Sequence, residues 1–207
     1  MTLIERLEEA KLAFSEYIPC EYRQGAGPRD ELVQKCLRQL QKVPEHLQQI
    51  MASEGAYIVF FNGPMTDNKE MTHLRGITPD GGVTTWDYYR GTHCTKTKAI
   101  LVGVNGPYGR FRNPFMHELG HSFDLNVGKY LLGFRLSGVN GVREGLATEP
   151  FPRPHLNRQR EYLAEAFRKF YLSPKSKQEL IEHHTKVYTV ISEIERRAEL
   201  AAIQVRE

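Results

Sequence analysis

The chain has 207 residues, 40% hydrophobic, 26% charged and 10% aromatic, which predicts a single globular domain. With 28 Lys and Arg against 25 Asp and Glu, the formal net charge is only +3, so the large basic excess typical of nucleic-acid-binding proteins is absent. No run of about 20 apolar residues predicts a membrane span, and the three cysteines lack the spacing of a disulfide framework or a cysteine zinc site.

The N-terminal quarter of the chain predicts helices. Leucines and a phenylalanine recur among charged residues at helical intervals over residues 2–18, and Pro19 ends that pattern. A second helix is expected with Asp30 as its N-cap, and Pro44 should break or restart it. These helices are expected to pack their apolar faces on a core and to expose their charged faces.

Two apolar runs in the middle of the chain predict strands. Residues 56–62 form an apolar run with β-branched and aromatic side chains, residues 97–104 form a second, aliphatic run, and each run is followed by glycine and proline. Between them, residues 64–96 are rich in Gly, Pro, Thr and Asp, which favours turns with short strands. The only tryptophan, Trp86, lies in this segment, and it either lines a cleft or belongs to the core.

The C-terminal half predicts helices again. The helical pattern from residue 112 is interrupted by glycines between 133 and 145 and by prolines between 150 and 154. A last helical region covers about 156–205, with a break expected at Ser173 and Pro174. Because no repeat or linker is visible, we expect one α+β domain, mostly helical around a small mixed sheet.

One motif in the predicted helix after residue 112 points to metal chemistry. Residues 117–121 read HELGH, an H-E-x-x-H motif. Side chains four residues apart lie about 6 Å apart along one helix face, so His117 and His121 can reach the same ion. A catalytic zinc needs three protein ligands and one open position. Glu118 could then act as a general base on the attacking water. The plain alternative is a pair of histidines on a solvated face without metal.

A helical wheel at about 100° per residue separates two faces of this helix. His117, His121 and Asp124 share one face. The opposite face is apolar and consists of Phe115, Met116, Leu119 and Phe123. We therefore expect Asp124 to accept a hydrogen bond from the free nitrogen of a ligand imidazole and to orient it.

The spacing alone leaves the third ligand open. Candidate ligands are His93, His155, His183 or His184, and a carboxylate on a later helix. His183 and His184 are adjacent and point about 100° apart on a helix, so a surface pair is the better interpretation. Glu161 and Glu165 lie opposite the apolar arc of their segment, and periodicity alone therefore favours a solvated face, with Glu165 pairing with Lys169.

The combination of motifs resembles a known family. The sequence HELGHSFD is followed some forty residues later by EYLAEAF, and preceded by RGITPDGGVTTWDYYRG and KAILVGV. Together these segments, over roughly residues 56–172, resemble the anthrax lethal-factor catalytic domain and the related secreted Pro-Pro endopeptidases. The resemblance implies a zincin-like metallopeptidase domain over residues 1–207, with N-terminal helices in 1–54 and a catalytic core in 55–207.

The resemblance also assigns roles within a zinc endopeptidase of the gluzincin type. It implies one zinc ion per chain, held by His117, His121 and Glu161, with Glu118 as general base and Glu165 as a carboxylate behind the ligands. The family places a tyrosine seven residues before the ligand glutamate, where it stabilises the oxyanion, and here that position is Pro154. His155 and Tyr130 are conceivable replacements for this oxyanion donor.

The missing tyrosine keeps a second function open, a catalytically impaired zincin-fold protein that binds peptides or a partner. A third possible function is that of a basic helical adaptor, and this interpretation predicts no bound metal. The expected partner of an enzyme is an extended peptide or protein, acted on by a monomer, with no nucleic acid involved. Residues 97–104 could be the sheet edge to which this peptide adds, or a central strand. Relatives are secreted, but the N-terminus lacks the pattern of a leader, so secreted and cytoplasmic locations both stay open.

Overall fold

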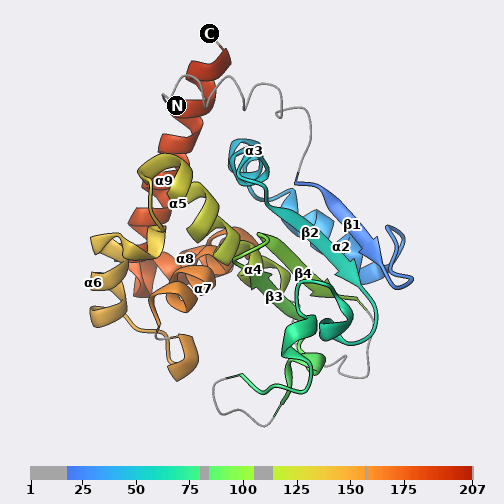
Figure 1. Cartoon of the computed structure of the whole chain (residues 1–207). Coiled ribbons are helices and arrows are strands. Elements are labelled where there is room, and N and C mark those ends of the chain that lie inside the picture. The colour runs from blue at the N-terminus through green and yellow to red at the C-terminus, as the bar shows by residue number, and fades with distance from the viewer. Residues whose placement is uncertain (1–17, 80–83, 105–113, 157, 207) are drawn as a thin grey trace.

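The computed structural model describes residues 18–79, 84–104, 114–156 and 158–206, and nearly all of the helix expected over 2–18 lies outside them. The helices and strands in chain order are β1 (Cys20–Arg23), α2 (Glu31–Leu40), α3 (Glu45–Ser53), β2 (Tyr57–Phe61), β3 (Gly91–Cys94), β4 (Ala99–Gly103), α4 (Phe115–Ser122), α5 (Gly128–Leu132), α6 (Asn140–Thr148), α7 (Gln159–Leu172), α8 (Pro174–His183) and α9 (Thr185–Arg206). In Figure 1 the strands lie on one side of the molecule and α5 to α9 gather on the other, with α4 between them. Within the described residues, no helix is long and apolar enough to cross a membrane.

The sheet has the strand order β1-β2-β4-β3. Strands β1, β2 and β4 run parallel, and β3 pairs with β4 in the antiparallel direction. This small mixed sheet among many helices confirms the expected α+β fold class. The alternative that residues 97–104 form an edge is wrong, because β4 is central and β1 and β3 are the edges. All five residues of β4 are buried, as an uninterrupted apolar run indicates for a strand covered on both faces.

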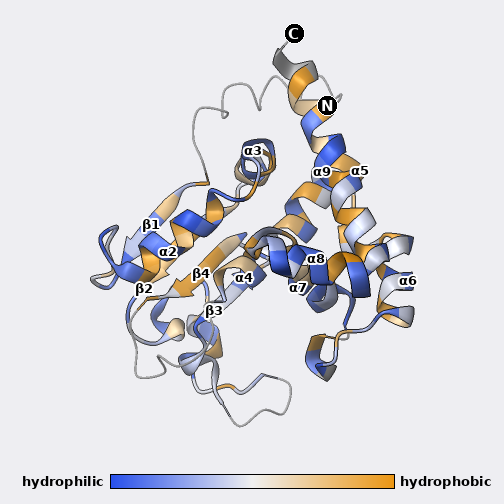
Figure 2. Cartoon of the chain, turned by 180° about the vertical axis from the view of Figure 1, so that it is seen from behind, coloured by the Kyte–Doolittle hydropathy of each residue, from blue (hydrophilic) through white to orange (hydrophobic). Residues whose placement is uncertain are grey.

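The two faces of the sheet belong to two apolar clusters. On one face Phe60, Ile100 and Val102 join the main core beneath α2, α3, α4 and α7. On the other face Phe61 and Leu101 join a smaller cluster with residues of the 64–96 segment, which forms short 3-10 turns as expected. Figure 2 shows β4 as hydrophobic and the surrounding helices with mixed hydropathy, which is typical of amphipathic helices around a buried sheet.

The N-terminal helices follow the prediction, with one addition. Asp30 occupies the N-cap position of α2, but its carboxylate accepts a hydrogen bond from the backbone N–H of Gly27 (2.8 Å) and none from the helix. Pro44 is the N-cap residue of α3, so the helical run breaks after α2 and begins again at Glu45. Strand β1 was not predicted, because its sequence CEYR carries two charges; such residues are common on edge strands. Segment 1–54 therefore contributes a strand as well as helices.

The C-terminal helices break where predicted and at one further place. Ser173 caps α8 reciprocally with Ser176, which explains the break before Pro174. A second break separates α8 from α9 at His184. The expectation of a surface pair is wrong for His184, which is buried, with Nδ1 2.7 Å from the carbonyl oxygen of Glu149 and its ring 4.1 Å from that of Phe151.

Candidate metal centre

Helix α4 presents the two histidines of the motif on one face. Its opposite side is fully buried, as the wheel predicted, and consists of Phe115, Met116, Leu119 and Phe123. The rings of His117 and His121 lie 4.9 Å apart and perpendicular to each other. Their side chains are 18% and 16% exposed, so both are shielded yet reachable from outside.

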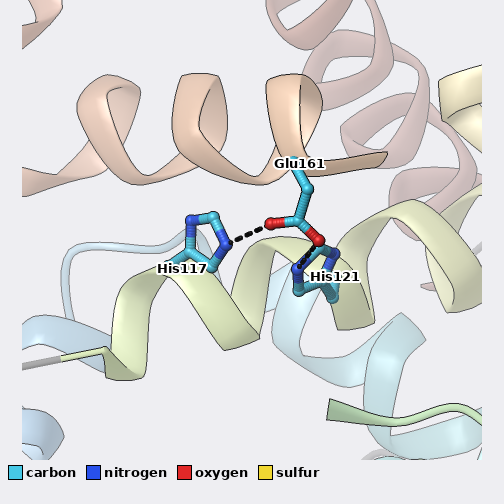
Figure 3. A group of neighbouring side chains, drawn as sticks. All are labelled: His117, His121 and Glu161. Atoms are coloured by element: carbon cyan, nitrogen blue, oxygen red, sulfur yellow. Dashed lines mark hydrogen bonds and ion pairs between the residues drawn. The ribbon is translucent and has the colours of Figure 1, made fainter. Parts of the chain in front are cut away.

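Helix α7 supplies the third group. Glu161 places one carboxylate oxygen 3.0 Å from Nε2 of His117 and the other 3.4 Å from Nε2 of His121 (Figure 3). Each of the three side chains offers one donor atom, and these atoms all lie within 4.8 Å of one another. Ligands about 2.0–2.1 Å from a tetrahedral zinc lie roughly 3.3 Å from one another, so the two distances from Glu161 are close to those of a zinc site. Among the described residues, these three form the group that could hold a metal; His93, His155, His183 and His184 are outside it.

A close approach of two helices places Glu161 over the histidines. A Cβ atom built on Gly120 would lie 2.8 Å from both the Cα and the carbonyl oxygen of Ala164, so α4 and α7 touch backbone to backbone. Glycine and alanine at this crossing allow that contact. The expectation of a solvated face for Glu161 and Glu165 is therefore wrong, because α4 covers it.

Glu165 lies next to His117, on the side away from Glu161. One of its oxygens is 3.6 Å from Nδ1 of His117, the nitrogen turned away from Glu161. Arg168 holds this carboxylate through two hydrogen bonds, of 2.7 and 2.5 Å. The pairing with Lys169 is wrong, since Lys169 binds Glu179 at 3.0 Å. Carboxylates in this position fix the orientation of ligand imidazoles.

The electrostatics of the cluster favour a positive charge between its members. Burial lowers the pKa of His117, but hydrogen bonds to Glu161 and Glu165 outweigh it and raise the pKa to about 10. Burial acts to raise the pKa of Glu165, yet Arg168 and His117 bring it down to about 2. The imidazoles likewise hold the pKa of Glu161 well below its ordinary value despite burial. A metal cation bound by His117 and Glu161 would replace the proton that the raised pKa of His117 favours.

Glu118 faces the same space as the ligands. Burial raises the pKa of its carboxyl, and the neighbouring imidazoles of His117 and His121 oppose that rise. The backbone N–H of His93, on edge strand β3, donates a hydrogen bond to it. A carboxylate with a raised pKa accepts protons readily, as a general base must.

Asp124 does not orient an imidazole as expected. It is fully buried, and its carboxylate accepts hydrogen bonds from the backbone N–H (2.7 Å) and hydroxyl (3.1 Å) of Ser137 and from Arg135 (3.3 Å). The wheel assumed α-helical geometry, whereas the chain forms a π-helix over Phe123–Val127. Asp124 thus anchors the loop after α5.

A cavity of about 300 Å³ opens over His117, His121 and Glu161. Trp86, Tyr89, Arg135 and Arg160 are among the residues that line it. The sequence alone did not predict that these two arginines lie at the site. The sequence signal for Arg160 was its place directly before Glu161. Neither candidate oxyanion donor lines this cavity. Tyr130 belongs to the buried core, and His155 is exposed elsewhere.

Comparisons with known proteins agree with this geometry. The family model described as "Anthrax toxin lethal factor, N- and C-terminal domain" matches residues 29–194. The solved structure of the Pro-Pro endopeptidase PPEP-2 from Paenibacillus alvei superposes with a TM-score of 0.69 at 18% sequence identity, over 93% of this chain and 100% of that one. At this identity the likeness establishes a shared fold. No curated protein matches the sequence significantly.

Proposed function

The chain belongs to the anthrax toxin lethal factor family, and from that premise we propose that it is a zinc-dependent endopeptidase. The observation that carries the proposal is the convergence of His117, His121 and Glu161 from two helices beside the half-buried Glu118. Two imidazoles and one carboxylate form a donor set found in catalytic zinc sites of peptidases. The donor atoms of these three side chains lie within 4.8 Å of one another, which supports the binding of one ion between them.

In this proposal each residue has a defined task. Zinc, when bound, supplies Lewis-acid polarisation of the peptide carbonyl and of water. Glu118 takes the proton of the attacking water and passes it to the nitrogen of the leaving amine. The raised pKa of Glu118 favours the first transfer, and the N–H of His93 keeps the carboxylate in place. Glu165, held by Arg168, fixes the ring of His117.

The substrate in this proposal is a peptide or protein chain that reaches the cavity in an extended form. Edge strand β3 lines that cavity with residues Gly91 to His93, and an edge strand offers unpaired backbone groups to an added strand. Because the relative of known structure is named a Pro-Pro endopeptidase, peptides with consecutive prolines are the first substrates to examine.

Cleavage of a peptide library, followed by mass spectrometry, tests the proposal. We expect zinc-loaded wild-type protein to cut a subset of peptides, including Pro-Pro sequences. Glu118→Gln should keep its zinc and lose roughly 10²–10⁴ in rate, because only the proton-transfer group is removed. Lys129→Gln, which changes an exposed lysine paired with Glu54, is the matched control and should cut at the wild-type rate.

The alternative function, a catalytically impaired peptide- or partner-binding protein, has one observation in its favour. Neither Tyr130 nor His155 reaches the cavity to replace the tyrosine that the family has at the position of Pro154. If zinc-loaded wild-type protein cuts nothing across a broad library, this alternative replaces the peptidase.

A further inference from the structure

The cavity beside the metal centre carries a positive charge that peptide hydrolysis does not use. Arg160, in the first turn of α7, is exposed and lines the cavity. Its guanidinium makes no hydrogen bond or ion pair in the part of the chain that the structure describes. Arginine is a planar donor that matches a carboxylate through two parallel hydrogen bonds.

The second cation of the cavity, Arg135, is held and largely neutralised. Its guanidinium is 28% exposed and lies 3.3 Å from the carboxylate of Asp124, which is fully buried. Asp124 is in turn fixed by the backbone and hydroxyl of Ser137. Arg135 is therefore held in place at the side of the cavity, whereas the N–H donors of Arg160 have no partner among the described residues.

Among the described residues that line the cavity, none supplies a counter-charge to Arg160. Burial, together with the positive charges of His121, Arg135 and Arg160, lowers the pKa of His93 to about 3, so that its ring is neutral at pH 7. Arg135 and Arg160 both line this cavity. A divalent ion would balance the charges of Glu118 and Glu161, and Asp124 balances Arg135. One positive charge is left.

We propose that the substrate carries a carboxylate close to the scissile bond and that Arg160 binds it. This inference rests on the proposed peptidase function and deepens it to a class of acidic peptides. The carboxylate can belong to an Asp or Glu side chain or to the free C-terminus of a short peptide. Both present the same planar pair of oxygens to the guanidinium.

The single tryptophan of the chain makes binding measurable without catalysis. Trp86 lines the same cavity, so its fluorescence reports peptides that enter it. The probes are proline-containing hexapeptides with an acetylated N-terminus and no other charged side chain, with one Glu or Gln placed at each position in turn, and each with an amidated or a free C-terminus. Titrated against zinc-loaded Glu118→Gln protein, the best Glu peptide should bind about tenfold more tightly than its Gln twin. If the carboxylate comes from the C-terminus, the free-acid peptide should outbind its amide instead.

Variants of Arg160 separate this contact from general charge attraction. Arg160→Gln should abolish the preference for the acidic peptide, and Arg160→Glu should reverse it, with zinc content unchanged. Arg38→Gln removes an exposed arginine of α2 as a matched control and should keep the preference. Equal binding of acidic and neutral peptides to the Glu118→Gln protein, or a preference that survives Arg160→Gln, overturns the inference.

Cleavage by the wild-type protein, measured in parallel, keeps the two proposals apart. Cleavage of neutral and acidic peptides at equal efficiency refutes only the carboxylate preference. No cleavage of any peptide, with zinc bound, refutes the peptidase function. A tenfold preference in binding that is also seen in kcat/KM supports both.

Discussion

The contact between α4 and α7 at Gly120 gives a prediction that links packing to metal binding. In Gly120→Ala the new methyl group would sit 2.8 Å from the backbone of Ala164, whereas ordinary contact begins near 3.4 Å. The atoms it meets are backbone atoms, so no side chain can rotate away. Helix α7 must therefore move away from α4 by about 0.6 Å, the difference between these two distances.

That displacement has two expected effects. Overpacking of this kind raises the free energy of the folded state by about 1–3 kcal/mol, and the better helix propensity of alanine offsets about 1 kcal/mol. A net loss of up to about 2 kcal/mol lowers the Tm by up to roughly 8 °C in a chain of this length. Zinc sites tolerate shifts of only about 0.2 Å in ligand distance, so moving Glu161 should weaken zinc binding by about tenfold or more.

Thermal unfolding of the metal-free protein and competition with a chromophoric zinc chelator measure these effects separately. Gly141→Ala is the matched control, since its new methyl group would meet a side chain of α9, Val190, at 2.6 Å and no part of the ligand helices. It should lower the Tm and leave zinc affinity unchanged. Wild-type zinc affinity in Gly120→Ala would refute the role assigned to the close helix contact.

Two further predictions concern the groups around His117. Glu165→Gln should weaken zinc binding by about 10–100-fold, because His117 loses its orienting partner. The control is Glu179→Gln, which removes the ion-pair partner of the neighbouring Lys169 and should leave zinc affinity unchanged. Equal zinc affinities in the two variants would contradict this prediction. In the metal-free protein the pKa of His117 is raised to about 10, so protonated His117 stabilises the fold fully below its ordinary pKa of 6.5 and progressively less as pH rises to 10. Zinc should displace that proton, so the affinity of the protein for zinc should rise with pH over this range. Calorimetry in buffers of different ionisation enthalpy measures the proton release. Zinc binding without proton release would contradict the role of His117 as a metal ligand.

The positions of His117 and His121 could be predicted from the sequence because both residues lie on one helix. The i and i+4 spacing of His117 and His121 and the apolar back of α4 determine how that helix lies, whatever surrounds it. Asp124 shows the limit of this reasoning. A helical wheel assumes a constant turn per residue, and the π-helix after Ser122 breaks that assumption.

The place of Glu161 beside the two histidines could not be predicted from periodicity, because it depends on which helix covers which face. Glu161 lies opposite the apolar arc of α7, a position usually exposed, but the close approach of α4 at Gly120 and Ala164 brings it against the histidines. The family resemblance singled out Glu161 where spacing left several candidates, and the structure places its carboxylate beside both histidines. Among the strands, the full burial of β4 marked it as central, whereas the charged edge strand β1 carried no comparable signal.

The most direct test of the metal centre is a crystal structure of the zinc-loaded protein with anomalous data on both sides of the zinc absorption edge. We expect one anomalous peak in each chain, about 2.0–2.2 Å from a ring nitrogen of His117, a ring nitrogen of His121 and an oxygen of Glu161. A peak at another group of residues, or none at full zinc saturation, would contradict the assignment of these three side chains as the metal site.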